Sequence, residues 1–399
     1  MKKVLFANGS YNEIPLIKSA HKFGYYVITS GNDPKGEGHR FSDKYIACDY
    51  SNKEALLAVA KENKVDAICS CGNDFAAISA AYAAEKLSLP GHDTYENTRF
   101  FHEKNKFKEL CKQLGLPTSL SFSFDSIDAA IKHLSSVKYP QIIKPSDLGG
   151  GKGVSVVYDY NSAVKAISRA YDLSKIKVIL IEDYIEGKQY GFTCFIRNKK
   201  VVFNYLSEDY SYLNPYMVWT AVSLYPNEEI KLRKRIVDDV EKAAGAINIY
   251  DGFLTIQLIV RDGEPFYIET MRRCLGNMHY LCLSNDFGID MYDLFMANEL
   301  GLSIDEILSS LREQKKTSAF MGIYSDSNGR FVDYSISSEF NRFIFYRYDL
   351  AEKESYVIDN YLSDKLGMVF LSFENKADRD LFLKEKNSVM NVKVIKEGF

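Results

Sequence analysis

Residues 138–157 read KYPQIIKPSDLGGGKGVSVV, and this stretch decides both the fold and the kind of site. An apolar strand ends in Lys144, and a run of glycines follows at Gly149, Gly150 and Gly151 before a second, β-branched strand. A glycine loop can lay its backbone N–H groups against phosphate oxygens because no side chain projects from Cα, and a nearby ammonium adds charge. The pattern predicts a flap over a triphosphate. For the glycines alone, a tight turn between two strands is the alternative.

Composition limits the classes of protein that this chain can belong to. With 399 residues we expect two or three packed domains, and 46% hydrophobic with 26% charged residues is ordinary for a globular protein. A formal net charge of -3 provides no basic surface for nucleic acid, so a small-molecule partner is favoured.

The cellular setting is predicted from the cysteines and from the absence of apolar spans. Seven scattered cysteines without CxxC pairing indicate reduced packing residues, and the short apolar run at the start is a first strand rather than an export signal. No stretch reaches the roughly 18 to 20 consecutive apolar residues that a membrane helix requires. We expect a cytoplasmic protein with no membrane partner.

The order of patterns along the chain predicts an α/β and α+β multidomain protein. Apolar runs alternate with helical patterns near the start, so we expect a Rossmann-like parallel sheet over residues 1–92, although the GxGxxG fingerprint is missing. Two α+β lobes are expected over residues 93–314, with one helical stretch over residues 100–115 that ends at Gly115. The flap-bearing lobe, at about 119–185, is expected to run strand, helix, strand, glycine turn, strand, helix and strand. The long strands after it predict a mostly antiparallel sheet with flanking helices. Strand-rich segments predict a small C-terminal α+β domain, largely β, over residues 315–399.

A candidate metal site lies in the stretch LTIQLIVRDGEPFYIETMRR, residues 254–273, which reads as two strands joined by an Asp-Gly turn. A three-residue loop ending at Glu264 would place Gln257 opposite Glu269 on one sheet face, whereas a two-residue loop would put them on opposite faces. Amide and carboxylate oxygens together suit Mg²⁺. Solvent-facing polar positions are the alternative. Arg273, after this pair, suits a charged transition state.

These elements occur in an order that resembles the ATP-grasp superfamily, particularly the branch with biotin carboxylase, carbamoyl phosphate synthetase and the purine-biosynthetic ligases. The resemblance covers roughly residues 1 to 310 and implies a central ATP-grasp fold behind a Rossmann-like domain. In HEKNKFKELCKQLGLP, Lys104 matches the first phosphate-contacting lysine, and Lys144 with its glycines matches the second lysine and the flap. In IEDYIEGKQYG the resemblance implies an adenine hinge, with Glu182 and Asp183 at the edge of the base and Ile185 beside the ring. Gln189 stands where the family often has a glutamate that contacts the nucleotide or the substrate.

The segment IETMRRCLG resembles the E-x-N-P-R element of the family, with two departures. Met271 stands where asparagine usually completes the metal shell, and Arg272 replaces proline, which leaves Arg273 on the arginine position. A methionine thioether is a poor partner for Mg²⁺. Gln257 in place of the commoner glutamate resembles carbamoyl phosphate synthetases.

The resemblance implies a carboxylate–amine ligase that uses ATP with Mg²⁺, or Mn²⁺, and makes an acyl phosphate. Lys144 and Arg273 are the expected catalytic residues. A carboxylase or carbamoyl-phosphate type of enzyme and a non-catalytic ATP-binding protein are the alternatives. An oxidoreductase is disfavoured because the dinucleotide fingerprint is absent.

The substrates are not encoded in any motif that we can decode. Four aromatic residues line a pocket or pack in a core, with packing favoured: Tyr210, Tyr212, Tyr216 and Trp219. His279 is either close to the substrate or structural. A homodimer is compatible with the sequence, since dimers are common among soluble enzymes.

Overall fold

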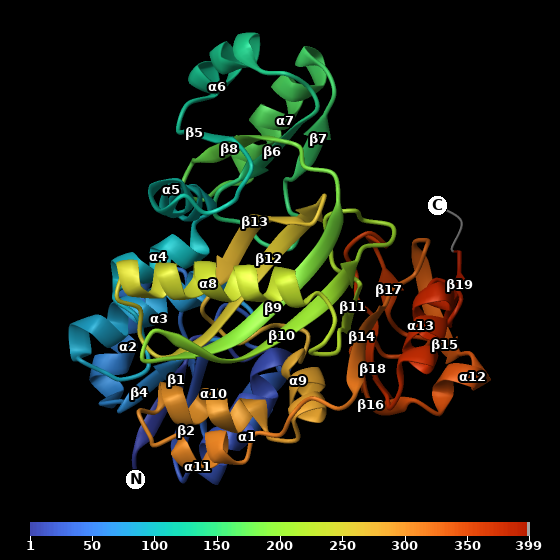
Figure 1. The fold of residues 1–399 in the computed structure, drawn as a ribbon. Coiled ribbons are helices and arrows are strands. Elements are labelled where there is room, and N and C mark those ends of the chain that lie inside the picture. Colours follow the sequence, from blue (N-terminus) through green and yellow to red (C-terminus); the bar gives the residue numbers. More distant parts are fainter. Residues whose placement is uncertain (397–399) are drawn as a thin grey trace. The chain divides into compact units, whose positions relative to one another are not determined.

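The computed structural model describes residues 1–396, and the chain divides into two compact units. Unit 1 comprises Met1–Tyr205, Glu229–Met278 and Asp290–Ser310, and unit 2 comprises Leu206–Glu228, His279–Ile289 and Leu311–Phe399. Each unit is therefore assembled from three separate segments, whereas the three predicted domains are consecutive; that division remains a prediction. The predicted α/β and α+β class is confirmed (Figure 1).

Unit 1 begins with a four-stranded parallel sheet in the order β3-β2-β1-β4. Apolar side chains of its strands and of the helices α2 and α3 form one core, in which Leu5, Ile28 and Ile68 are fully or almost fully buried. The helix α2 begins after the N-cap Asn52 and ends at Lys64, whose backbone is in the left-handed region. The elements of this part are β1 (Lys3–Phe6), α1 (Ile14–Lys22), β2 (Tyr26–Gly31), β3 (Lys44–Ala47), α2 (Lys53–Asn63), β4 (Ala67–Cys69) and α3 (Asp74–Leu87).

The helical stretch predicted over residues 100–115 is interrupted, which corrects that expectation. The helix α4 (Tyr95–His102) ends at Glu103, whose backbone is extended, and α5 (Lys104–Leu114) begins directly after it. The break has a tertiary cause, because the backbone N–H of Lys104 donates to the carbonyl of Ser146 at 3.0 Å instead of continuing α4. Gly115 ends α5 in the left-handed conformation, as predicted.

A second sheet of four antiparallel strands, in the order β5-β8-β6-β7, forms the flap-bearing lobe. The predicted succession of strand, helix, strand, glycine turn, strand, helix and strand is confirmed. The helices α6 and α7 lie over this sheet (Figure 1) and share a core with it that includes Ile143, Ile167 and Ile181. The elements are β5 (Ser121–Phe124), α6 (Ile127–His133), β6 (Gln141–Pro145), β7 (Ser155–Val157), α7 (Tyr160–Leu173) and β8 (Ile179–Asp183).

The remainder of unit 1 is built on long antiparallel strands in the order β13-β12-β9-β10, as the sequence predicts. The strand β10 continues into unit 2, where its residues from Ser207 onward pair with β11. The elements are β9 (Lys188–Arg197), β10 (Lys200–Tyr210), α8 (Ile230–Ala246), β12 (Gly252–Arg261), β13 (Glu264–Met271), α10 (Met291–Glu299) and α11 (Asp305–Ser309).

Unit 2 contains the sheet segment β11-β14-β18-β16 and a small sheet in the order β17-β15-β19. Its core includes Trp219, Phe331 and Phe373. The elements are β11 (Thr220–Ser223), α9 (Tyr280–Phe287), β14 (Thr317–Ile323), β15 (Gly329–Ile336), α12 (Ser338–Asn341), β16 (Ile344–Asp349), β17 (Val357–Ile358), β18 (Gly367–Phe373), α13 (Lys376–Glu385) and β19 (Met390–Ile395).

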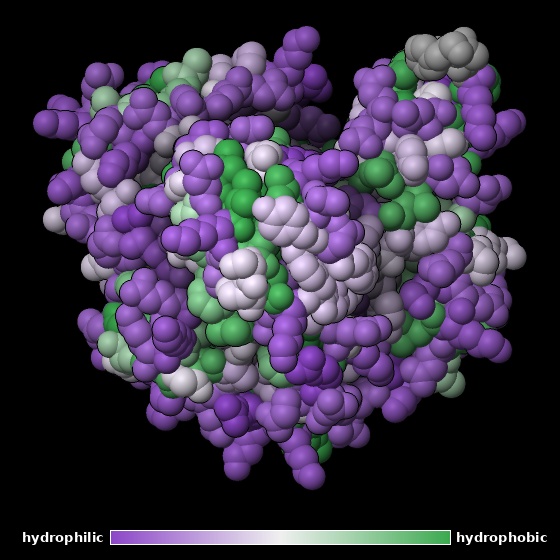
Figure 2. All heavy atoms as spheres, turned by 90° about the horizontal axis from the view of Figure 1, so that it is seen from above, coloured by the Kyte–Doolittle hydropathy of each residue, from purple (hydrophilic) through white to green (hydrophobic). Residues whose placement is uncertain are grey.

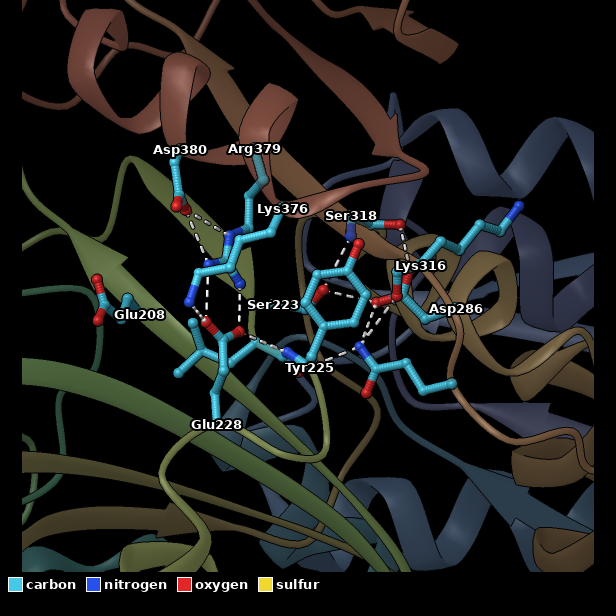
Figure 3. A network of polar contacts seen from close by, with 12 residues as sticks. Glu208, Ser223, Tyr225, Glu228, Asp286, Lys316, Ser318, Lys376, Arg379 and Asp380 are labelled. Carbon is cyan, nitrogen blue, oxygen red and sulfur yellow. Dashed lines mark hydrogen bonds and ion pairs between the residues drawn. The ribbon is translucent and has the colours of Figure 1, made fainter.

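Polar contacts join the elements of unit 2 (Figure 3). The carboxylate of Asp286, on α9, accepts hydrogen bonds from the hydroxyl groups of Ser223 at 2.6 Å and Ser318 at 2.5 Å. Burial raises the pKa of Asp286 to about 7. Arg379, on α13, forms a two-point ion pair with Glu228, which follows β11. Burial opposes ionisation of Glu228, but the hydrogen bonds and charge of Arg379 prevail and lower its pKa to about 2.

The cysteines are packing residues, as the sequence predicts, and the surface carries mostly polar side chains (Figure 2). Hydrophilic residues predominate on the face shown in Figure 2, with hydrophobic residues in small groups between them. All seven cysteines are buried. Among the helices of residues 1–396, none is long and apolar enough to cross a membrane.

Candidate active site

Three lysines of unit 1 converge on two carboxylates beneath the glycine loop. Lys104 and Lys108 lie one turn apart on α5, and Lys144 lies on β6; all three are buried. The Nζ of Lys144 lies 3.0 Å from one oxygen of Glu182, and the Nζ of Lys108 lies 3.3 Å from the other. Lys104 pairs with Glu269 at 2.6 Å. Buried lysines are rare unless they are paired, so this cluster is a specific feature of the fold.

The charge of this cluster is not balanced. Three ammonium groups share two carboxylates, so one positive charge is left over within the cluster. Burial lowers the pKa of Lys144, against the attraction of Glu182, which it shares with Lys108. Lys104 is buried as well, but its close ion pair with Glu269 prevails and raises its pKa. A polyanion bound here would supply the missing negative charge.

Glu182, on β8, is held in its charged form. Its side chain is only 3% exposed, and it accepts a hydrogen bond from the hydroxyl of Ser119 at 2.7 Å. Burial alone would raise its pKa, but Lys108 and Lys144 prevail and lower the pKa to about 2. In this structure the Glu182 carboxylate is therefore the counter-ion of Lys108 and Lys144.

Gln257 and Glu269 lie opposite each other on β12 and β13, as predicted, but the reason differs from the one expected. The turn is a two-residue one, since Arg261 pairs with Glu264, and Asp262 and Gly263 both have positive φ. That turn alone would put the two side chains on opposite faces. An irregularity between Gln257 and Leu258 leaves Ile268 unpaired and shifts the register by one residue. The two oxygen donors therefore share one face.

The glycine loop between β6 and β7 has backbone conformations that suit glycine. Gly150 has φ +67° with open space around its Cα, and Gly153 has φ +74° with its Cα packed against Pro145. The loop is connected to the lysine cluster, because Lys104 donates from Nζ to the carbonyl of Leu148 at 2.8 Å. Because Leu148 directly precedes Gly149, this bond ties the start of the glycine loop to Lys104.

Arg273 and Arg272 have different surroundings. The guanidinium of Arg273 pairs with Asp74 through Nε at 2.8 Å and Nη2 at 3.2 Å. Arg272 is bound to Asp93 at 2.8 Å and donates to the carbonyls of Phe253 and Tyr250, both at 2.7 Å. Arg272 is thus fixed in a structural role.

The hinge residues lie at the end of β8 and the start of β9. The carboxylate of Asp183 is exposed and accepts from the side chain of Gln141 at 2.8 Å. Ile185 and Gln189 are half-buried, and Gln189 pairs in register with Ile259 of β12. The adenine contacts assigned to these residues and to Glu182 remain predictions.

The other residues singled out in the sequence lie elsewhere. Met271 is buried at the end of β13 opposite Thr255. In unit 2, Trp219 belongs to the hydrophobic core and stacks on Tyr212 with ring centroids 4.8 Å apart, which agrees with packing. Tyr210 packs against the same core, and Tyr216 is half-buried. Burial lowers the pKa of His279 to about 4.

Three residues of this region were missed by sequence reasoning. Lys108 stands four residues after Lys104, a spacing that puts both on one helix face and that could have been noticed. Asp74 is 199 positions from Arg273, and His102 contacts Asp74 across 28 positions. No local pattern signals contacts over such separations.

Unit 1 thus combines a glycine loop with a cluster of buried lysines. Residues 102–215 match the family described as phosphoribosylglycinamide synthetase, ATP-grasp (A) domain. This match supports the resemblance to the ATP-grasp superfamily that the sequence predicted.

Whole-chain comparisons show the same fold. The chain is 22% identical over 336 residues to the carbamoyl phosphate synthase large chain of Clostridium beijerinckii, a match that covers 82% of this chain and 31% of that protein. It thus spans about a third of the length of that relative. The L-amino acid ligase from Bacillus licheniformis superposes with a TM-score of 0.81 at 18% identity, covering 99% of both chains. Phosphoribosylglycinamide synthetase from Anaerococcus prevotii gives 0.77 at 19% identity, covering 99% of this chain and 100% of that chain.

Proposed function

We propose that this chain is an ATP-dependent carboxylate–amine ligase that works with Mg-ATP through an acyl phosphate. The unbalanced cluster of buried lysines supports this proposal most strongly. Lys104, Lys108 and Lys144 share only Glu182 and Glu269, and the glycine loop lies against the cluster. A triphosphate fits both the lysine cluster and the glycine loop. It brings negative charge to the ammonium groups and hydrogen-bond acceptors to the N–H groups of the loop.

The residues present fit a divalent ion. Gln257 and Glu269 offer hard oxygen donors on one sheet face, and the contact with Lys104 shows that the Glu269 carboxylate already meets a cation. Residues 1–396 contain no group of three or more His, Cys, Asp or Glu side chains that could hold a metal, so phosphate oxygens and water would complete the shell. When bound, Mg²⁺ or Mn²⁺ would neutralise charge on the phosphates.

The protein groups have distinct tasks in the reaction. Lys104 and Lys144 hold the phosphates, and Arg273 orients the substrate carboxylate. A carboxylate oxygen attacks the γ-phosphorus, forming a C(O)O–P bond while the bond to the β-phosphate oxygen breaks and ADP leaves. An amine then attacks the acyl carbon, phosphate departs, and the amine loses a proton to give the amide. The closed flap excludes water that would hydrolyse the acyl phosphate.

Adenine would lie against the hinge, with the backbone of Glu182 and Asp183 at the edge of the base and Ile185 beside the ring. Gln189 would lie close to the nucleotide or the substrate. The half-burial of Ile185 and Gln189 supports this placement, since an incoming base could cover them further. We also propose that two copies of the chain form a homodimer.

Two other functions are supported by particular observations. Similarity to a carbamoyl phosphate synthase over 82% of the chain favours a carboxyphosphate reaction, in which bicarbonate replaces the organic acid. The buried Met271, in the position of a metal ligand in related proteins, favours a protein that binds ATP without turning it over.

One experiment separates these functions. ADP release is measured with Mg-ATP against pooled carboxylic acids and pooled amines, and separately with labelled bicarbonate. The ligase proposal expects ADP release that needs both pools and Mg²⁺. It also expects loss of that activity in Lys144→Met but not in Lys165→Met, an exposed position of α7 in the same lobe. Labelled product from bicarbonate alone, or nucleotide binding without any turnover, would contradict the ligase.

A further inference from the structure

Asp74, on a helix that packs beside the N-terminal parallel sheet, binds one edge of the Arg273 guanidinium. Asp74 is the first residue of α3, and its two oxygens meet Nε and Nη2 of Arg273 at 2.8 and 3.2 Å. These two nitrogens form one side of the planar guanidinium, so the pairing fixes the rotation of the group. The edge between Nη1 and Nη2 keeps donor capacity, of which Nη1 uses one hydrogen on the carbonyl of Cys274 at 3.3 Å.

His102 in turn holds Asp74. Its Nε2 accepts from the backbone N–H of Arg272 at 3.2 Å, so this nitrogen carries no hydrogen. The proton therefore sits on Nδ1, which donates to Asp74 at 2.7 Å. The His102 side chain is fully buried, and that of Arg273 is 10% exposed. Arg272 and Arg273 are neighbours in sequence. A second connection between them runs through His102, which contacts Arg272, and Asp74, which contacts Arg273.

The charges of this group favour one ionic form. Burial opposes the charge on Asp74, but Arg273 and His102 prevail and hold the pKa of its carboxyl well below the usual range. Burial likewise opposes the charge of Arg273, and Asp74 raises its pKa. The pair is therefore ionised at neutral pH, and the ion pair fixes the orientation of the guanidinium in the absence of substrate.

The first glycine of the flap lies close to the same carboxylate. A Cβ at Gly149 would lie 3.3 Å from Oδ2 of Asp74, closer than most such contacts. The first flap glycine thus lies directly beside the group that orients Arg273.

We propose that Asp74 and His102 are positioning residues for the acid substrate. They hold the Arg273 guanidinium so that its Nη1–Nη2 edge receives the substrate carboxylate end-on. The inference rests on the proposed ligase function. It assigns α3, a helix beside the N-terminal sheet, to the site of the acid substrate. It also gives a role to the acidic first residue of α3, which contacts Arg273 although the two residues are 199 positions apart in sequence.

The experiment compares Asp74→Asn, which keeps the shape but not the charge, with Asp74→Glu, which keeps the charge. Asp128→Asn is the matched control, because Asp128 is an exposed acid in the first turn of α6. The first measurement is NMR exchange of the Arg273 Nε–H with water, assigned by its loss in Arg273→Lys. We expect slow exchange in the wild type and the control, and at least tenfold faster exchange in Asp74→Asn.

The second measurement is the KM for the acid and for ATP in the ADP-release assay. Loss of a charge-assisted contact predicts an acid KM about 10- to 100-fold higher in Asp74→Asn, with the KM for ATP unchanged and partial recovery in Asp74→Glu. Slow exchange together with an unchanged acid KM in Asp74→Asn would overturn the inference. So would equal rises of both KM values, which indicate a merely structural role. If the wild type turns over no acid, the ligase proposal fails, while the exchange measurement still decides whether Asp74 fixes Arg273.

Discussion

The Glu182→Gln substitution should destabilise unit 1 by an amount that the structure lets us work out. The lowering of its pKa from 4.5 to about 2 corresponds to about 3 kcal/mol, at roughly 1.4 kcal/mol per pKa unit, in favour of the charged carboxylate. The side chain is only 3% exposed, so solvent screening reduces this value little. A neutral amide would also leave Lys108 and Lys144 without a counter-charge, and breaking a buried pair typically costs about 3 to 5 kcal/mol. Both arguments predict a loss of about 3 kcal/mol at pH 7.

Urea unfolding of the variant tests this value, with the transition of unit 1 identified by its shift when MgADP is added. Glu186→Gln, an exposed position in the following turn, is the matched control. Because the folded-state pKa of Glu182 is lowered, its stabilisation is present above about pH 4.5 and is lost as pH falls towards 2. The difference between wild type and variant should shrink over this window. A loss below about 1 kcal/mol at pH 7, or a difference that does not change with pH, would refute the reasoning.

Four further predictions concern other parts of the molecule. Lys144→Met should weaken MgADP binding about 10- to 100-fold by calorimetry, because one charge-assisted phosphate contact is lost; unchanged affinity would exclude Lys144 from the nucleotide site. Gly150→Val puts a β-branched residue at φ +67°, so turnover in the ADP assay should fall more than MgADP affinity, and equal activity would argue against a flap role. Removing metal with EDTA should abolish ADP release and Mn²⁺ should restore it, whereas metal-independent turnover would contradict the assigned donors. Burial raises the pKa of Asp286 to about 7, so its stabilisation of unit 2 is present at low pH and is lost as pH rises from about 4 to 7; Asp286→Asn should lose this dependence in thermal melts, and a parallel profile would contradict it.

Features encoded in contiguous sequence were predictable. The strand that carries Lys144 and the glycines after it are close together in the chain, so their proximity needed no tertiary information. The helix α2 carries its own start signal at Asn52. The succession of strands and helices in the flap lobe was readable for the same reason.

Features that depend on tertiary contacts could not be predicted from the sequence. The pairing of Gln257 with Glu269 was predicted from the wrong loop length, because the irregularity that leaves Ile268 unpaired is decided by how the strands meet. The break at Glu103 depends on a bond from Lys104 to Ser146, which no helical pattern reports. The contact of Asp74 with Arg273 is likewise visible only after folding.

The account depends most directly on where a nucleotide binds. A crystal structure with Mg²⁺ and a non-hydrolysable ATP analogue should place the Nζ atoms of Lys104 and Lys144 at about 3 Å from phosphate oxygens. Side-chain oxygens of Gln257 and Glu269 should lie at about 2.1 Å from the ion. Phosphates bound away from the lysine cluster, with Gln257 and Glu269 turned away from the ion, would contradict the account.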